Sequence, residues 1–185
     1  MVEVVPTLLI TGPVGVGKTT VAGEAANLLG EAGVSHGFVD VDALRWCYPA
    51  PPDDRFRVGI ALRNLAAVWA TYREYGARRL ILADVLEDRA ALAGYLRAVP
   101  GAAITVVRLR APAATLAAQV ARRETGNGLA WHLARAAELA GQMDRDRVED
   151  LLIDTAERPA ATIAREVLLR AGWLDDESGV VSRES

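Results

Sequence analysis

Short apolar runs alternate along the chain with longer stretches in which apolar residues recur every three or four positions. The short runs predict buried strands at 7–11, 37–41, 79–83, 103–109 and 151–154. The longer stretches predict helices at 18–33, 53–75, 89–99, 129–147 and 159–171, and a further helix opened by Pro112. This alternation is typical of a parallel sheet with helices on both faces.

The residues that end or cap the predicted helices, and the size of the chain, both indicate one domain. Gly33 and Gly76 are placed to end helices, and Asp53 is placed to cap the helix that it opens. The chain has 185 residues, of which 51% are hydrophobic and 24% charged, and these values are typical of one globular domain. We expect this domain to span 1–174 and the polar segment 175–185 to be a disordered tail.

The first predicted strand runs into a glycine-rich loop that contains the only lysine of the chain, Lys18. The segment 12–19 fits the P-loop pattern G-x-x-x-x-G-K-[ST], in which backbone N–H groups and a helix N-terminus bind phosphates. It predicts that Lys18 bridges the β- and γ-phosphates of ATP and that Thr19 holds Mg²⁺. The expected nucleotide-binding residues are Gly12, Val14, Gly15, Val16, Gly17, Lys18, Thr19 and Thr20.

Features of other P-loop proteins are missing from the sequence. A guanine-reading Asn-Lys-x-Asp element needs a second lysine, which the chain lacks. Motor ATPases usually carry Asp-Glu after an apolar strand, whereas Asp84 is followed by Val85. We expect Asp84 to lie near Mg²⁺, and phosphoryl transfer to a second substrate fits better than hydrolysis.

A pair of carboxylates, Asp40 and Asp42, follows the second predicted strand. Residues at i and i+2 point the same way if the strand geometry continues. We expect Asp40 to hold Mg²⁺ through water and Asp42 to serve as the base or the substrate anchor. The alternative is that one carboxylate caps the next helical turn while the other is solvated. Arg45, Arg57 and Arg63 are candidates to bind an anionic substrate, and Trp46 could line its pocket.

Together, the P-loop, the Asp40-Val-Asp42-Ala-Leu-Arg45 segment and Asp154-Thr155 resemble small-molecule kinases of the nucleoside-monophosphate-kinase-like group. This group includes adenylylsulfate, gluconate and shikimate kinases and chloramphenicol phosphotransferase. The resemblance implies a three-layer α/β/α fold with five parallel strands in the order 2-3-1-4-5, and a helical lid around 122–135. It implies lid arginines that act on the transferring phosphoryl group, for which Arg122 and Arg123 are the best candidates and Arg135 a weaker one.

Net charge and cysteine content narrow the class of protein further. A formal net charge of −3 argues against a nucleic-acid partner, and no apolar run is long enough for a membrane span. The single cysteine, Cys47, excludes an internal disulfide, and the N-terminus has no signal-peptide pattern, so we expect a cytoplasmic protein.

The sequence thus predicts an ATP- and Mg²⁺-dependent kinase that phosphorylates a hydroxyl of a small molecule. The alternative is a P-loop ATPase or nucleotide-dependent switch without such an acceptor. Neither the acceptor nor the oligomeric state follows from the sequence.

Overall fold

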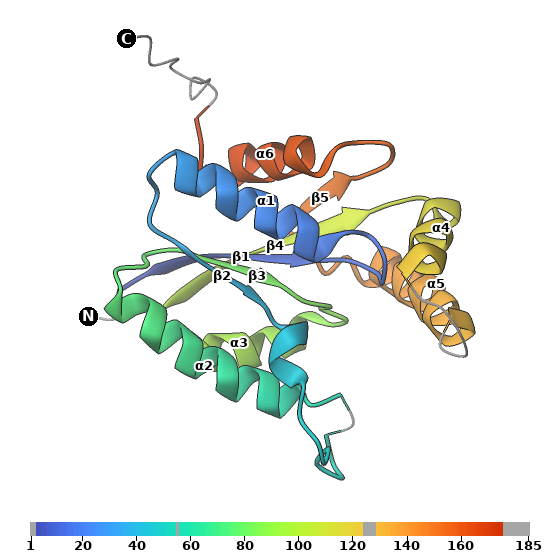
Figure 1. The fold of residues 1–185 in the computed structure, drawn as a ribbon, viewed down its shortest axis with the longest axis horizontal. Coiled ribbons are helices and arrows are strands. Elements are labelled where there is room, and N and C mark those ends of the chain that lie inside the picture. The colour runs from blue at the N-terminus through green and yellow to red at the C-terminus, as the bar shows by residue number, and fades with distance from the viewer. Residues whose placement is uncertain (1–2, 55, 124–128, 176–185) are drawn as a thin grey trace.

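A parallel five-stranded sheet forms the middle of the molecule (Figure 1). The computed structural model describes residues 3–54, 56–123 and 129–175, with the side chain of Arg123 left out. The strands are β1 (Val5–Thr11), β2 (Gly37–Asp40), β3 (Leu80–Ala83), β4 (Ala102–Arg110) and β5 (Leu151–Asp154). All four neighbouring pairs are parallel, and the order β2-β3-β1-β4-β5 confirms the expected topology.

Helices cover both faces of the sheet. Helices α1 (Lys18–Glu31) and α6 (Ala160–Arg170) lie on one face, and α2 (Val58–Glu74) and α3 (Leu92–Ala98) lie on the other (Figure 1). Because successive strand side chains point to opposite faces, the central strand supplies both layers. Leu8 and Ile10 pack in the cluster beneath α1 and α6, whereas Leu9 packs in the cluster above α2 and α3.

Two further helices lie beyond the end of β4 rather than on a face of the sheet. These are α4 (Ala113–Arg123) and α5 (Leu129–Asp146), which pack against each other at the side of the molecule (Figure 1). The expected lid, 122–135, would include the end of α4 and the start of α5. Residues 124–128 of the expected lid lie outside the described part of the chain, as does 176–185 of the expected tail.

The start of α2 corrects one expected boundary. The helix begins at Val58 and not near Asp53, because Arg57 adopts a left-handed conformation, with φ 54°, that interrupts the helix. The carboxylate of Asp54 accepts hydrogen bonds of 2.8 Å from the N–H groups of Val58 and Gly59, so Asp54 caps the helix from within the loop. The predicted helix at 89–99 divides into a 3₁₀ turn, Arg89–Ala91, and α3.

Candidate active site

Two glycines let the loop between β1 and α1 turn tightly beside β4. Gly12 has φ 148°, and a Cβ atom there would lie 2.6 Å from the carbonyl oxygen of Leu109. Gly17, directly before α1, has φ 94°, a conformation that other residues rarely adopt. The loop therefore turns into the N-terminus of α1, where free N–H groups and the helix dipole favour an anion.

The loop forms one wall of a cleft of ≈ 430 Å³, called here the P-loop cleft. Its lining residues are Val14, Gly15, Gly17, Lys18, Thr19, Thr20, Asp40, Asp42, Val85, Val120 and His132. The ammonium of Lys18 lies over the loop and donates to the carbonyls of Gly12, at 3.1 Å, and Pro13, at 3.3 Å. Six of the eight expected nucleotide-binding residues thus face one cavity, while Val16 is buried and Gly12 shapes the turn behind it.

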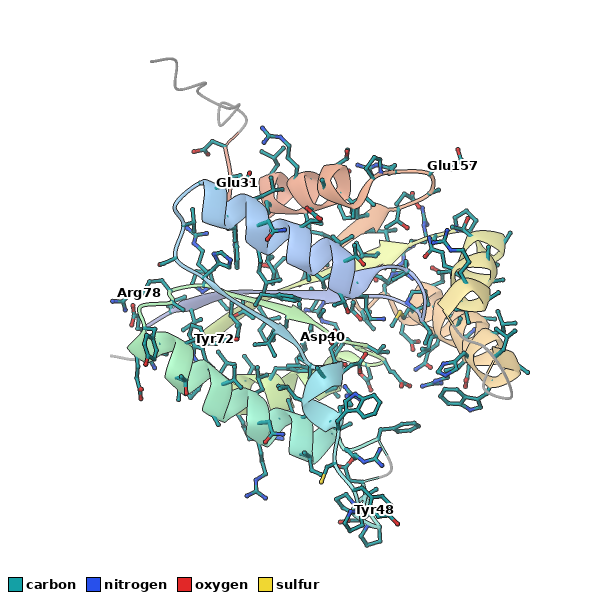
Figure 2. All side chains as sticks on the ribbon, in the orientation of Figure 1. Glu31, Asp40, Tyr48, Tyr72, Arg78 and Glu157 are labelled. Carbon is teal, nitrogen blue, oxygen red and sulfur yellow. The ribbon has the colours of Figure 1, made fainter. Side chains whose placement is uncertain are left out.

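A threonine and two aspartates meet at the base of this cleft. The hydroxyl of Thr19 donates to a carboxylate oxygen of Asp40 at 2.8 Å, and the backbone N–H of Asp42 donates to the other Asp40 oxygen at 3.1 Å. Asp40 ends β2 at the carboxyl edge of the sheet (Figure 2). Hydroxyl and carboxylate oxygens are ligands that suit Mg²⁺, which commonly takes one or two protein groups together with substrate phosphates. The donor set at Thr19 and Asp40 therefore fits the expected ion.

Asp42 lies where the P-loop cleft meets a second cavity. This second cavity, called here the aromatic hollow, has a volume of ≈ 700 Å³ and is lined by Asp42, Arg45, Trp46, Cys47, Tyr48 and Arg57. Asp42 is the one residue common to the linings of both cavities within the described parts of the chain. Its carboxylate is half exposed and pairs with the Nε of Arg45 at 3.2 Å. The structure thus brings Asp42, Arg45 and Arg57 together, and leaves Arg63 on α2 outside this lining.

Asp84 occupies a different environment from Asp40 and Asp42. It is 1% exposed, and its carboxylate accepts from Arg45 Nη2 and from the Tyr95 hydroxyl, each at 2.5 Å. Burial raises the pKa of the Asp84 carboxyl, against the opposing attraction of Arg45 and the hydrogen bond from Tyr95. Burial and the neighbouring Asp84 carboxylate also raise the pKa of Tyr95, so its hydroxyl remains a donor. Arg45 links Asp84 to Asp42, while Asp84 itself does not line the P-loop cleft.

The expected lid arginines lie in separate places. Arg122 lines a third cavity of ≈ 230 Å³ on the other side of the P-loop, together with Gly17, Thr20, Thr155 and Arg158. Arg123 ends α4, and its side chain lies outside the described part of the structure. Arg135 on α5 is paired with Glu87 and Glu138.

Several residues of the site were not found by reasoning from the sequence, among them His132 and Tyr95. His132 on α5 lines the P-loop cleft, although its place in a helical stretch carries no sign of this. Tyr95 on α3 donates a hydrogen bond to Asp84, but its position in the sequence is typical of an ordinary core residue of a helix. Neither belongs to a local motif, because each reaches the site only through packing of a distant helix.

Together, the sheet order, the P-loop and the flanking helices define the fold of P-loop small-molecule kinases. A gluconokinase from Sinorhizobium meliloti 1021 matches with a TM-score of 0.61 at 22% identity, over 90% of this chain and 91% of that one. Shikimate kinase from Acinetobacter baumannii in complex with shikimate gives 0.58 at 18%, over 91% and 93%. The Mycobacterium tuberculosis APS kinase CysC in complex with AMPPNP and APS gives 0.58 at 25%, over 90% and 96%.

Comparison by sequence is less informative than comparison by structure. No protein-family model and no curated protein sequence matches the chain. Among the described residues, no helix is long and apolar enough to cross a membrane.

Proposed function

We propose that the protein is an ATP- and Mg²⁺-dependent kinase that transfers the γ-phosphoryl group to a hydroxyl of a small molecule. The observation that carries this proposal is the position of Asp42 between the P-loop cleft and the aromatic hollow. A nucleotide on the P-loop and an acceptor in the aromatic hollow would meet at this carboxylate. The APS kinase bound to AMPPNP and APS shows that a protein of this fold holds an ATP analogue and a second small molecule together.

The residues of the cleft have separate parts in this reaction. The P-loop N–H groups and Lys18 bind the phosphates, and Thr19 and Asp40 would hold Mg²⁺, which would neutralise phosphate charge. Asp42 orients the acceptor hydroxyl and accepts its proton as the oxygen bonds to the γ-phosphorus and the bond to the leaving ADP oxygen breaks. Arg122 supports the nucleotide from the far side of the loop. Positioning and charge stabilisation supply most of the rate in such transfers.

Exchanging the carboxylate of Asp42 for an amide tests this assignment. The Asp42→Asn variant keeps its shape but loses the proton acceptor, so acceptor-dependent ADP release should fall by about 10²–10⁴-fold. Binding of AMPPNP, measured by calorimetry, should stay within about twofold of the wild type, because Lys18 and the loop are unchanged. The exposed Asp146→Asn on α5 is the matched control and should retain full turnover.

The acceptor is to be found in the same assay. A panel of hydroxyl compounds is screened for ATP consumption, with the Lys18→Ala protein as the background. Wild-type turnover in Asp42→Asn would contradict the role of Asp42. If no compound raised ATP consumption above the Lys18→Ala background, the kinase proposal would give way to the alternative, a nucleotide-binding switch without an acceptor.

A further inference from the structure

Exposed apolar side chains gather beside Asp42. Of the eight large hydrophobic side chains exposed in the described residues, four lie between 46 and 58, and of these Trp46 and Tyr48 line the aromatic hollow. Trp46 is 91% exposed and Tyr48 is 93% exposed. Tyr48 stands in the loop that projects away from the sheet (Figure 2). Two aromatic rings left in water next to a candidate catalytic carboxylate are typical of a ligand-binding surface.

The cationic side chains of the aromatic hollow are Arg45 and Arg57, which differ in their ion pairs. Arg45 is already engaged, with Nη2 on Asp84 at 2.5 Å and Nε on Asp42 at 3.2 Å. The Nε atoms of both arginines are buried without a hydrogen-bond partner, but Arg57, unlike Arg45, makes no ion pair among the described residues. Because Asp42 and Asp84 already compensate Arg45, the guanidinium of Arg57 is the cation that the hollow can offer to a ligand.

Arg57 adopts a backbone conformation that costs free energy. Its left-handed conformation, with φ 54° and ψ 34°, is unfavourable for an arginine by roughly 1 kcal/mol. The conformation is held because the Arg57 N–H donates to the carbonyl of Asp54 at 2.9 Å, while the carboxylate of Asp54 caps α2. A strained residue held in this way at the wall of a cavity indicates a functional position.

We propose that the acceptor is a hydroxyl compound that carries both an aromatic ring and an anionic group. Its ring lies on Trp46 and Tyr48, its anion binds Arg57, and its hydroxyl reaches Asp42. A volume of ≈ 700 Å³ accommodates such a molecule, within the usual range for ligand pockets of roughly 300–1,000 Å³. This inference rests on the proposed function for the fate of the hydroxyl, but the ligand class follows from the hollow itself.

The ligand class is tested by binding, apart from catalysis. Hydroxyl compounds are sorted into four groups by the presence of a ring and of an anion. Phenyllactate represents both, phenylpropanediol the ring alone, gluconate the anion alone, and glycerol neither. Binding is measured by saturation-transfer NMR and titration, in the presence of AMPPNP. Compounds of the phenyllactate group should bind most tightly.

Two variants locate the binding in the aromatic hollow. Trp46→Ala should weaken binding of the aromatic anions by about tenfold, because it removes a stacking surface. Arg57→Gln should weaken it by about 10- to 100-fold, because it removes a charge-assisted hydrogen bond. The exposed Tyr75→Ala and Arg97→Gln lie outside the hollow and should bind as the wild type does. AMPPNP affinity should be the same in all four variants.

The results separate this inference from the kinase proposal. It is overturned if gluconate or glycerol binds more tightly than the aromatic anions, if no aromatic anion binds saturably, or if Trp46→Ala and Arg57→Gln leave binding unchanged. ATP consumption stimulated by gluconate without binding of aromatic anions would support the kinase proposal and refute the proposed ligand class. Aromatic anions that bind in the aromatic hollow but never stimulate ATP consumption would support the proposed ligand class and refute the kinase proposal.

Discussion

Replacing Tyr95 by phenylalanine removes one hydroxyl from the buried group that anchors Arg45. The Tyr95 hydroxyl donates to Asp84 at 2.5 Å, and both side chains are at most 5% exposed. Without it, one carboxylate oxygen of Asp84 loses a donor in a place that water does not readily reach. The other oxygen keeps the hydrogen bonds from Arg45 and from the N–H of Val85.

A buried hydrogen bond to a charged group stabilises a fold by about 1.5–3 kcal/mol. Tyr95→Phe should lower the free energy of unfolding by that amount. With a urea m-value of about 2–3 kcal/mol/M for a domain of this size, the unfolding midpoint should fall by about 0.5–1.5 M. Urea titrations followed by circular dichroism measure the shift. Because Arg45 pairs with Asp42, the variant should also change acceptor-dependent turnover more than AMPPNP affinity.

Tyr72→Phe is the matched control for this experiment. The Tyr72 hydroxyl also reaches from a helix to the sheet, since it donates to the carbonyl of Phe38 on β2, but at 3.5 Å and at a partly exposed site. Its removal should cost less than about 0.5 kcal/mol. Equal losses in the two variants, or a smaller loss for Tyr95→Phe, would refute the view that the buried Asp84 group stabilises the fold.

Two further predictions concern the loop and the last helix. Gly12→Ala should weaken AMPPNP binding at least about tenfold by calorimetry, since its Cβ would lie 2.6 Å from the Leu109 carbonyl; unchanged affinity would contradict this. Burial acts to raise the pKa of Glu166, but hydrogen bonds from Arg158 and Arg170 outweigh it, and the net pKa is lowered. A lowered folded-state pKa stabilises the fold above the unfolded value of 4.5 and loses this effect as pH falls. Urea midpoints of wild type and Glu166→Gln should therefore differ near neutral pH and converge in acid, and a gap that widened in acid would argue against the pairing.

Much of the fold could be predicted because its signals are local. Apolar runs located all five strands, and the order confirmed by the structure follows from the resemblance of the P-loop and Asp40–Asp42 segments to known kinases. The start of α2 was misplaced because the left-handed conformation of Arg57 delays the helix to Val58, and arginine gives no local sign of such a conformation. Asp54, and not Asp53, caps the helix.

The residues of the site also fall into those that local sequence predicts and those that only packing brings together. The sequence by itself determined where phosphate would bind, because the glycines, Lys18 and Thr19 act within one continuous loop and the helix that follows. Only the tertiary structure decided what surrounds Asp42 and Asp84. Arg45 and Asp84 are 39 positions apart and meet because β2 and β3 are neighbours in the sheet, while α3 brings Tyr95 against them. Such contacts depend on strand order and helix packing, which no short stretch of sequence encodes.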